Sequence, residues 1–189
     1  MIVGIDYGSN LAGTTVVCFG NYMGQLHIER SAKKINTDQW LIKLLDKISP
    51  KLIGIDAPLS IPLALKQKNP KSNQNFFFRQ CDIETKAMSP MFLGGLTARA
   101  IALKSKAPSA QWIEVYPARL VAELKLKHYK KDISKCMAEL TAHYQITINP
   151  SDLTDWHALD SVLAYLSAFR FSINKHITFG GPSEGLIVV

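Results

Sequence analysis

The first nine residues of the chain, Met1 to Ser9, read MIVGIDYGS. Their apolar run ends at Asp6 and turn residues follow, which predicts a buried strand with a carboxylate at its end. The same pattern returns at residues 52–56, LIGID, before an Ala-Pro pair stops the run. Laid side by side and parallel, these strands would bring Asp6 and Asp56 to one edge of a sheet. Two carboxylates at such a short distance repel each other, and this repulsion raises the pKa of each unless a cation lies between them.

Composition predicts one globular domain spanning residues 1–189, large enough to bury roughly 70% of its unfolded surface. The three cysteines are far apart and form no CxxC pair, which favours neither a disulfide framework nor a zinc site and fits a reducing cytoplasm. No stretch approaches the roughly 20 apolar residues that span a bilayer, and Met1 leads directly into a strand, so we expect no membrane association and no signal peptide. The net charge of +7 favours a polyanionic partner such as nucleic acid.

Hydrophobic periodicity predicts an antiparallel meander followed by a strand–helix–strand crossover. The meander consists of the first strand and strands at 13–20 and 25–30. A helix over Thr37–Ile48 then separates it from the strand that ends at Asp56, which makes a parallel partner for that strand the expected arrangement. Further elements are predicted in order: a helix at 96–104, a strand at 111–116, and helices at 117–126 and 132–144.

Residues 57–95 break the periodic pattern with four prolines and several lysines. A loop insertion this long inside a compact domain is usually functional or mobile, so we expect a lid or a substrate loop. Lys66, Lys68, Lys71 and Arg79 would then contact a phosphate backbone, as would the basic stretch at 125–131. The alternative is a surface excursion whose three consecutive phenylalanines, 76–78, are buried in the core and whose lysines serve solubility.

The last predicted helix begins near Thr154 and carries His157 and Asp160 on one face of its first turns. Asp160 continues into Ala164 and Ala168, a row of small residues that would let this helix approach a sheet closely. We therefore expect the Asp160 carboxylate, which lies on this row, to contact other protein groups and not only solvent. The tail after residue 180 reads as a turn followed by a short apolar segment.

Three antiparallel strands, a crossover helix, further parallel strands and closing helices match the ribonuclease H-like plan, an α/β fold with a mixed five-stranded sheet. In that plan Asp6, Asp56 and Glu114 come from neighbouring strands and Asp160 from the final helix. Such a cluster suits two hard cations, Mg²⁺ or Mn²⁺, about 3.5 to 4 Å apart, which hold a phosphodiester and generate a hydroxide. We expect Asp6, Asp56 and Asp160 to be the metal ligands.

Each of these residues also has a structural interpretation. An Asp after a strand is often a turn residue, and Glu114 can pair with a basic neighbour such as Arg119. His157 is either a structural histidine or one that orients a water or phosphate oxygen, or protonates the leaving group. Convergence of all of them at one place favours the catalytic interpretation.

Several short segments of the chain, taken together, resemble the signature segments of the domain of unknown function 429 family, whose members are described as predicted ribonuclease H-like nucleases. They are GIDYGS at 4–9, GIDAPLS at 54–60, RQCD at 79–82, TAR at 97–99, EVYPA at 114–118, HALDS at 157–161 and EGLI at 184–187. The resemblance covers essentially the whole chain. It implies a ribonuclease H-like fold and a metal-dependent nuclease, and it adds Arg99 to the candidate substrate-binding residues. Asp160 resembles the last-helix acid of Holliday-junction resolvases, with His157 where those proteins often have a second acid.

Two other functions remain open. One is a catalytically silent nucleic-acid-binding or scaffold protein on the same fold, because a protein can retain its acidic residues after it has lost catalytic activity. The other is a nucleotide-binding relative of the actin and sugar-kinase superfamily, whose first strand has a sequence similar to the GID segment of this chain. Those proteins close two such domains around a nucleotide, and this chain is too short for both.

Overall fold

The computed structural model describes residues 1–107 and 109–189 and has an α/β architecture built on a mixed seven-stranded sheet. The strands of this sheet, in spatial order, are β4 (His27–Arg30), β2 (Val16–Gly20), β1 (Ile2–Asp6), β5 (Leu52–Asp56), β6 (Gln111–Val115), β9 (Gly185–Val188) and β8 (Thr178–Gly181). β2 is antiparallel to β1 and β4, whereas β1, β5, β6 and β9 are mutually parallel. A separate pair joins β3 (Gly24–Gln25) to β7 (Ile146–Thr147).

The sheet has two more strands than the five expected. The difference lies in the C-terminal tail, where β8 and β9 form an antiparallel hairpin and β9 pairs with β6. The apolar segment after residue 184 therefore covers the edge of β6, which would otherwise offer unpaired backbone groups to another chain. The antiparallel meander and the parallel pairing of β1 with β5 agree with the sequence prediction.

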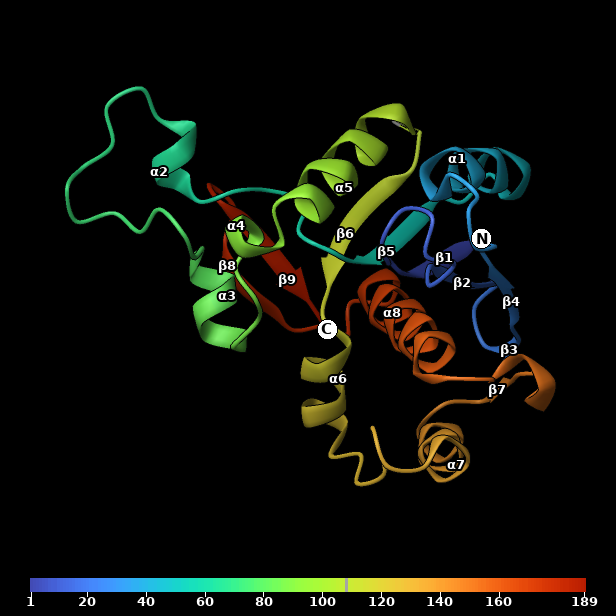
Figure 1. The fold of residues 1–189 in the computed structure, drawn as a ribbon. Helices are drawn as coiled ribbons and strands as arrows, with labels where there is room; N and C mark the ends of the chain where they lie inside the picture. Colours follow the sequence, from blue (N-terminus) through green and yellow to red (C-terminus); the bar gives the residue numbers. More distant parts are fainter. Residues whose placement is uncertain (108) are drawn as a thin grey trace.

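Helices cover both faces of the sheet (Figure 1). α1 (Thr37–Ile48) and α5 (Gly95–Lys106) lie on one face, and α6 (Pro117–Leu124), α7 (Ile133–His143) and α8 (Trp156–Ser172) lie on the other. Each face has its own core: Val3, Ile5 and Ile53 pack toward α1 and α5, whereas Ile2 and Leu52 belong to the core around α8. The two cores draw on alternate residues of each strand because successive side chains of a strand point to opposite faces of the sheet. Among the described residues no helix combines the length and apolar character needed to cross a bilayer.

Glycines in β1 and β5 let α8 pack directly on the sheet. A Cβ atom at Gly4 would overlap the backbone nitrogen of Tyr165, and one at Gly54 would lie 2.8 Å from the carbonyl oxygen of Ala164. The row of small residues predicted on this helix therefore faces the strands, with the Cβ of Ala168 close to Gly54. In both strands the glycine stands two residues before the aspartate, so the aspartate side chain points to the same face as α8.

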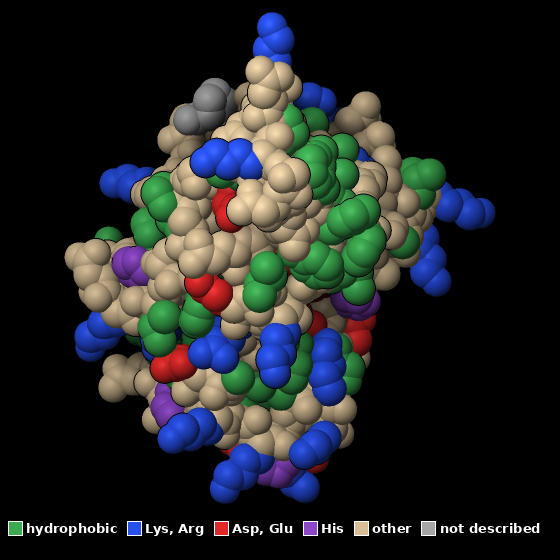
Figure 2. Space-filling view, turned by 90° about the vertical axis from the view of Figure 1, so that its left-hand side faces the viewer, with side chains coloured by type: hydrophobic (Ala, Val, Ile, Leu, Met, Phe, Trp, Pro, Cys, Tyr) green, Lys and Arg blue, Asp and Glu red, His purple; other side chains and the backbone are tan. Residues whose placement is uncertain are grey.

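The insertion at 57–95 is not structureless. It contains three short helices, α2 (Leu63–Lys66), α3 (Gln80–Thr85) and α4 (Pro90–Leu93). Phe76 and Phe77 are 40% and 54% exposed, so they are not buried in the core. Figure 2, which looks onto the side where α2, α3 and α4 lie in Figure 1, shows hydrophobic side chains gathered on this face.

Candidate functional site: a carboxylate cluster at the end of β1 and β5

Asp6 and Asp56 are direct neighbours at the carboxyl ends of two parallel strands. The β1–β5 register pairs Gly4 with Gly54 and Asp6 with Asp56. Adjacent strands lie about 4.8 Å apart, so two carboxylates extend from the same face of the sheet at close range. The prediction that the two GID segments lie side by side is confirmed. This edge is where parallel α/β sheets generally bind their ligands.

The first turns of α8 complete this cluster. Asp155 caps the helix by accepting a hydrogen bond from the Ala158 nitrogen at 3.1 Å, one residue later than the predicted cap, Thr154. His157 Nδ1 then lies 2.8 Å from Asp6 Oδ2. The Asp160 carboxylate is close enough to Asp6 to raise the pKa of Asp6. The structure therefore gathers Asp6, Asp56, His157 and Asp160 as predicted.

Two residues that the sequence analysis did not assign to the cluster bind Asp160. Tyr129 donates its hydroxyl hydrogen to Asp160 Oδ1 at 2.8 Å, and Lys130 places its ammonium 2.6 Å from Oδ2. Lys130 belongs to the predicted basic stretch, but it faces the carboxylates as well as solvent. Residues 129 and 130 lie in the turn before α7, and no spacing in the sequence links them to a carboxylate 30 positions later.

Burial, followed by repulsion between the carboxylates, dominates the electrostatics of this cluster. Burial and repulsion from Asp160 raise the pKa of Asp6 to about 6, although the neighbouring His157 opposes the rise. Burial together with the charges of Asp6 and Asp160 raises the pKa of Asp56 well above its ordinary value. Carboxylates in this condition favour either protons or a cation between them. Hard divalent cations prefer such oxygens, so the donor set of Asp6 and Asp56 fits Mg²⁺ or Mn²⁺.

Glu114 lies outside this cluster. β6 pairs Glu114 with Ile55 rather than with Asp56, and its side chain therefore points to the opposite face of the sheet. There it forms a two-pronged ion pair with Arg79, with distances of 2.6 Å from Nη2 to Oε1 and 2.7 Å from Nη1 to Oε2. The expected convergence of Glu114 with Asp6 and Asp56 is not found, and its partner is Arg79 rather than Arg119.

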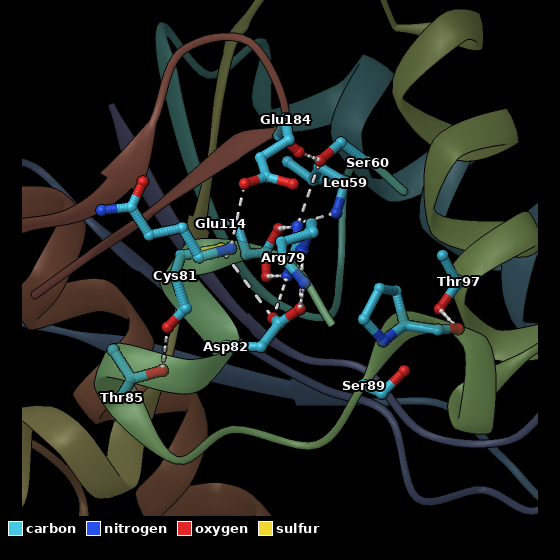
Figure 3. A network of polar contacts seen from close by, with 12 residues as sticks. Leu59, Ser60, Arg79, Cys81, Asp82, Thr85, Ser89, Thr97, Glu114 and Glu184 are labelled. Atoms are coloured by element: carbon cyan, nitrogen blue, oxygen red, sulfur yellow. Dashed lines mark hydrogen bonds and ion pairs between the residues drawn. The ribbon is translucent and has the colours of Figure 1, made fainter. Parts of the chain in front are cut away.

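Arg79 is at the centre of a buried polar network (Figure 3). Its side chain is fully buried, and besides Glu114 it contacts Asp82 at 2.6 Å and Ser60 at 3.1 Å. Burial alone would lower the pKa of Arg79, but the hydrogen bonds that it donates to Glu114 and Asp82 outweigh burial and raise the pKa. All of this guanidinium is occupied inside the protein, which removes Arg79 from the surface that could bind a substrate.

The network holds the insertion against the sheet. Glu114 Oε2 also accepts a hydrogen bond from the Leu59 nitrogen at 2.9 Å. Glu184, in the β8–β9 turn, accepts from the Gln80 nitrogen at 3.1 Å and the Leu63 nitrogen at 3.3 Å, at the first residues of α3 and α2. The segments around residues 79, 114 and 184, far apart in the sequence, thus meet in one polar network (Figure 3).

The other predicted substrate-binding residues are dispersed. Arg99 forms an ion pair with Asp38 at 2.7 Å, donates to the Gly8 carbonyl at 3.1 Å and stacks over the Tyr7 ring at 4.7 Å. Lys66, Lys68 and Lys71 are exposed on α2 and the loop after it, at the periphery of the molecule and away from α8 (Figure 1). The structure does not bring these lysines to the carboxylates.

Within residues 1–107 and 109–189, no three His, Cys, Asp or Glu side chains are arranged closely enough to form a ready-made metal centre. The cluster instead has other protein side chains bound to it: the imidazole of His157 contacts Asp6, and the ammonium of Lys130 contacts Asp160. No protein-family model matches the chain, and a comparison with curated proteins gives no match.

Proposed function

We propose that this protein is a divalent-metal-dependent nuclease that hydrolyses phosphodiester bonds in nucleic acid, on a ribonuclease H-like fold. One observation carries the proposal: Asp6 and Asp56 are register partners on adjacent parallel strands, and Asp160 of the last helix lies near enough for its charge to raise the pKa of both. Carboxylates so placed are destabilised without a cation and suited to hold one.

The topology supports the fold assignment. The strand order β4-β2-β1-β5-β6 places the first strand beside the strand that follows the crossover helix, as the ribonuclease H-like plan requires. The hairpin of β8 and β9 extends that plan at one edge. The final helix delivers its acid to the first strand because Gly4 and Gly54 allow close packing.

The residues of the cluster would divide the work of hydrolysis. Asp6 and Asp56 would hold Mg²⁺ or Mn²⁺, which when bound supplies positive charge to a phosphodiester. His157 holds Oδ2 of Asp6 at 2.8 Å and so fixes the orientation of that carboxylate. Asp160 is already hydrogen-bonded by Tyr129 and Lys130, so its contribution to an ion requires those contacts to rearrange.

A polyanionic substrate is supported by charge. The chain carries a net charge of +7, and lysines of the insertion and of the 125–131 stretch are exposed. Such residues attract a phosphate backbone without reading its sequence. The same lysines are also compatible with a purely solubilising surface.

One observation favours a catalytically silent binding or scaffold protein as the second candidate. His157 and Lys130 directly partner the carboxylates of Asp6 and Asp160. A cluster whose carboxylates are already bound by protein side chains can persist as a structural feature of the fold. The two candidates differ in whether the cluster binds a divalent ion and whether a bound strand is cut.

The deciding experiment combines metal binding with cleavage. Mn²⁺ at a concentration about a hundredfold above its Kd should raise the Tm of the protein by about 5 to 10 °C, because an ion that binds only the folded state stabilises that state. Asp6→Asn and Asp56→Asn should abolish both that rise and the cleavage of single-stranded and branched oligonucleotides. The matched control is Asp46→Asn, an exposed carboxylate on α1. An Mn²⁺ response that persists in both cluster variants would refute the proposal.

A further inference from the structure

The ammonium of Lys130 occupies a built position inside the carboxylate cluster. Its Nζ lies 2.6 Å from Asp160 Oδ2, and the other oxygen of that carboxylate accepts the Tyr129 hydroxyl hydrogen at 2.8 Å. Asp160 itself is buried, whereas the Lys130 side chain is 48% exposed. Both oxygens of Asp160 are therefore engaged by protein donors, and a charge-assisted contact of this length is among the stronger hydrogen bonds.

Aromatic rings fix the ammonium from the sides. Nζ lies 4.9 Å from the centre of the Tyr129 ring and 5.4 Å from that of Trp156. These two rings meet edge to face at a centroid distance of 5.7 Å. A lysine ammonium over aromatic faces gains a further electrostatic attraction. The carboxylate and the two rings together form a receptor for one positive charge.

Lys130 is also one of eight non-glycine residues of the described chain with a positive φ. Lys130 has a φ of 58°, in the left-handed region that non-glycine residues seldom adopt. The turn is closed by the Lys131 and Asp132 nitrogens, which both donate to the His128 carbonyl at 3.0 Å. Backbone conformations of this kind persist where the surrounding structure enforces them, and they concentrate at functional sites.

We propose that Lys130 is a built-in cation that takes the place of a second divalent ion beside Asp160, so that the cluster binds a single divalent ion, at Asp6 and Asp56. This inference rests on the proposed metal dependence and specifies its stoichiometry. A fixed ammonium supplies charge without an exchangeable ion, and its exposed N–H donors remain available to a phosphate oxygen of a bound strand. Lys130 would thus contribute the substrate charge recognition that was expected of the peripheral lysines.

The test is titration calorimetry of the full chain with MnCl₂ alone. The parent protein should bind one Mn²⁺ per chain. Lys130→Met removes the charge and keeps an unbranched side chain, so it should open Asp160 to a second ion or tighten Mn²⁺ binding by at least about tenfold. Lys130→Arg keeps the charge and should still bind one ion. The matched control is Lys43→Met, an exposed lysine on α1, which should titrate like the parent.

Three outcomes would overturn the inference: two ions per parent chain, unchanged stoichiometry and affinity in Lys130→Met, or no Mn²⁺ binding in either protein. If Lys130→Met does not fold, the double variant Lys130→Met/Asp160→Asn removes both partners of the pair and should bind one ion as the parent does; two ions would again overturn the inference. Cleavage assays separate this inference from the proposed function. One ion per parent chain without cleavage would support the built-in cation and reject the nuclease.

Discussion

Gly4 of β1 lies against the backbone of Tyr165 in α8, so closely that a Cβ atom would overlap the Tyr165 nitrogen. The same Cβ would also collide with the carbonyl oxygen of Ser161. Two residues further along β1, Asp6 reaches His157 at 2.8 Å. Contact between strand and helix therefore determines the geometry of the candidate site, because the helix that carries His157 and Asp160 can approach only where a side chain is missing.

Gly4→Ala should consequently destabilise the fold and disturb the cluster together. Overpacking of a tight interface typically costs about 1 to 3 kcal/mol in the free energy of unfolding, and here the colliding atoms are backbone, so we expect the upper part of that range. Urea denaturation measures the loss. Gly95→Ala is the control, since no atom lies within 4 Å of its Cβ position, and it should be neutral or stabilising. Equal stability of the two variants would contradict the packing argument.

Stability without metal should depend on pH through Asp6. Its pKa is raised from 3.8 to about 6 in the folded protein by burial and by Asp160, so the folded state holds the proton more tightly than the unfolded chain. The corresponding stability is fully present below about pH 4 and is lost as the pH rises through 6. The advantage of Asp6→Asn over the parent should therefore grow across this window, by at most about 3 kcal/mol. Denaturation in EDTA at pH 4 to 7 tests this, and an advantage that shrinks with rising pH would contradict it.

Much of this architecture could be predicted from sequence because the signals are local. The repeated GID pattern identifies β1 and β5, the helix at Thr37–Ile48 implies their parallel pairing, and the helical spacing of His157 and Asp160 puts them on one face. Each of these inferences needs only a period and a short segment. The resulting group of three aspartates and a histidine agrees with the structure.

The residues whose positions were predicted wrongly have a common physical origin: strand register and pairing between segments far apart in the sequence decide where they lie. The strand that contains Glu114 has the predicted alternation of side chains. Glu114, however, pairs with Ile55 instead of Asp56, so its side chain lies on the face of the sheet opposite to that of Asp56. A difference of one residue in strand register decides the face. The ion pairs of Arg79 with Glu114 and of Lys130 with Asp160 join segments that lie far apart along the chain. Composition made both basic residues look like surface groups, and only the folded chain reveals their partners.

Arg79→Met should be among the most damaging substitutions outside the core. It would leave the buried carboxylates of Asp82 and Glu114 without their cation, and breaking a buried ion pair in this way typically costs about 3 to 5 kcal/mol. Adding Glu114→Gln should recover part of the loss, because one uncompensated charge disappears. Chemical denaturation measures both variants. Arg119→Met, whose ion pair with Glu123 is long and partly exposed, should cost about 1 kcal/mol.

The lysines of the insertion give a prediction about salt. If Lys66, Lys68 and Lys71 track a phosphate backbone, replacing all three by Ala should flatten the dependence of log K on log salt, by about 0.9 for each phosphate of duplex DNA that the lysines neutralise in the parent. Fluorescence anisotropy with a labelled oligonucleotide gives the slope. Their position on and after α2, away from the carboxylates, means that metal binding should not change. Parent-like slopes in the triple variant would assign these lysines to solubility.

The last prediction separates His157 from the metal ligands. Its Nδ1 contacts Asp6 Oδ2, while its ring remains 45% exposed, so it can orient that carboxylate and still face a substrate. A hard cation prefers oxygen to imidazole nitrogen, and Asp6 should therefore be the ligand with His157 beside it. His157→Ala should then keep Mn²⁺ affinity within about threefold and lower the cleavage rate by about 10- to 100-fold, the usual effect of removing such a supporting group.

His157→Asp is the sharper variant, because it adds an oxygen ligand at the same position. It should bind Mn²⁺ more tightly than the parent and retain more cleavage than His157→Ala. Asp6→Asn provides the contrast, since it removes a ligand and should lose binding and cleavage together. Mn²⁺ titration beside single-turnover cleavage distinguishes these outcomes. A loss of Mn²⁺ affinity in His157→Ala as large as that in Asp6→Asn would make the histidine itself a ligand and reverse this division of roles.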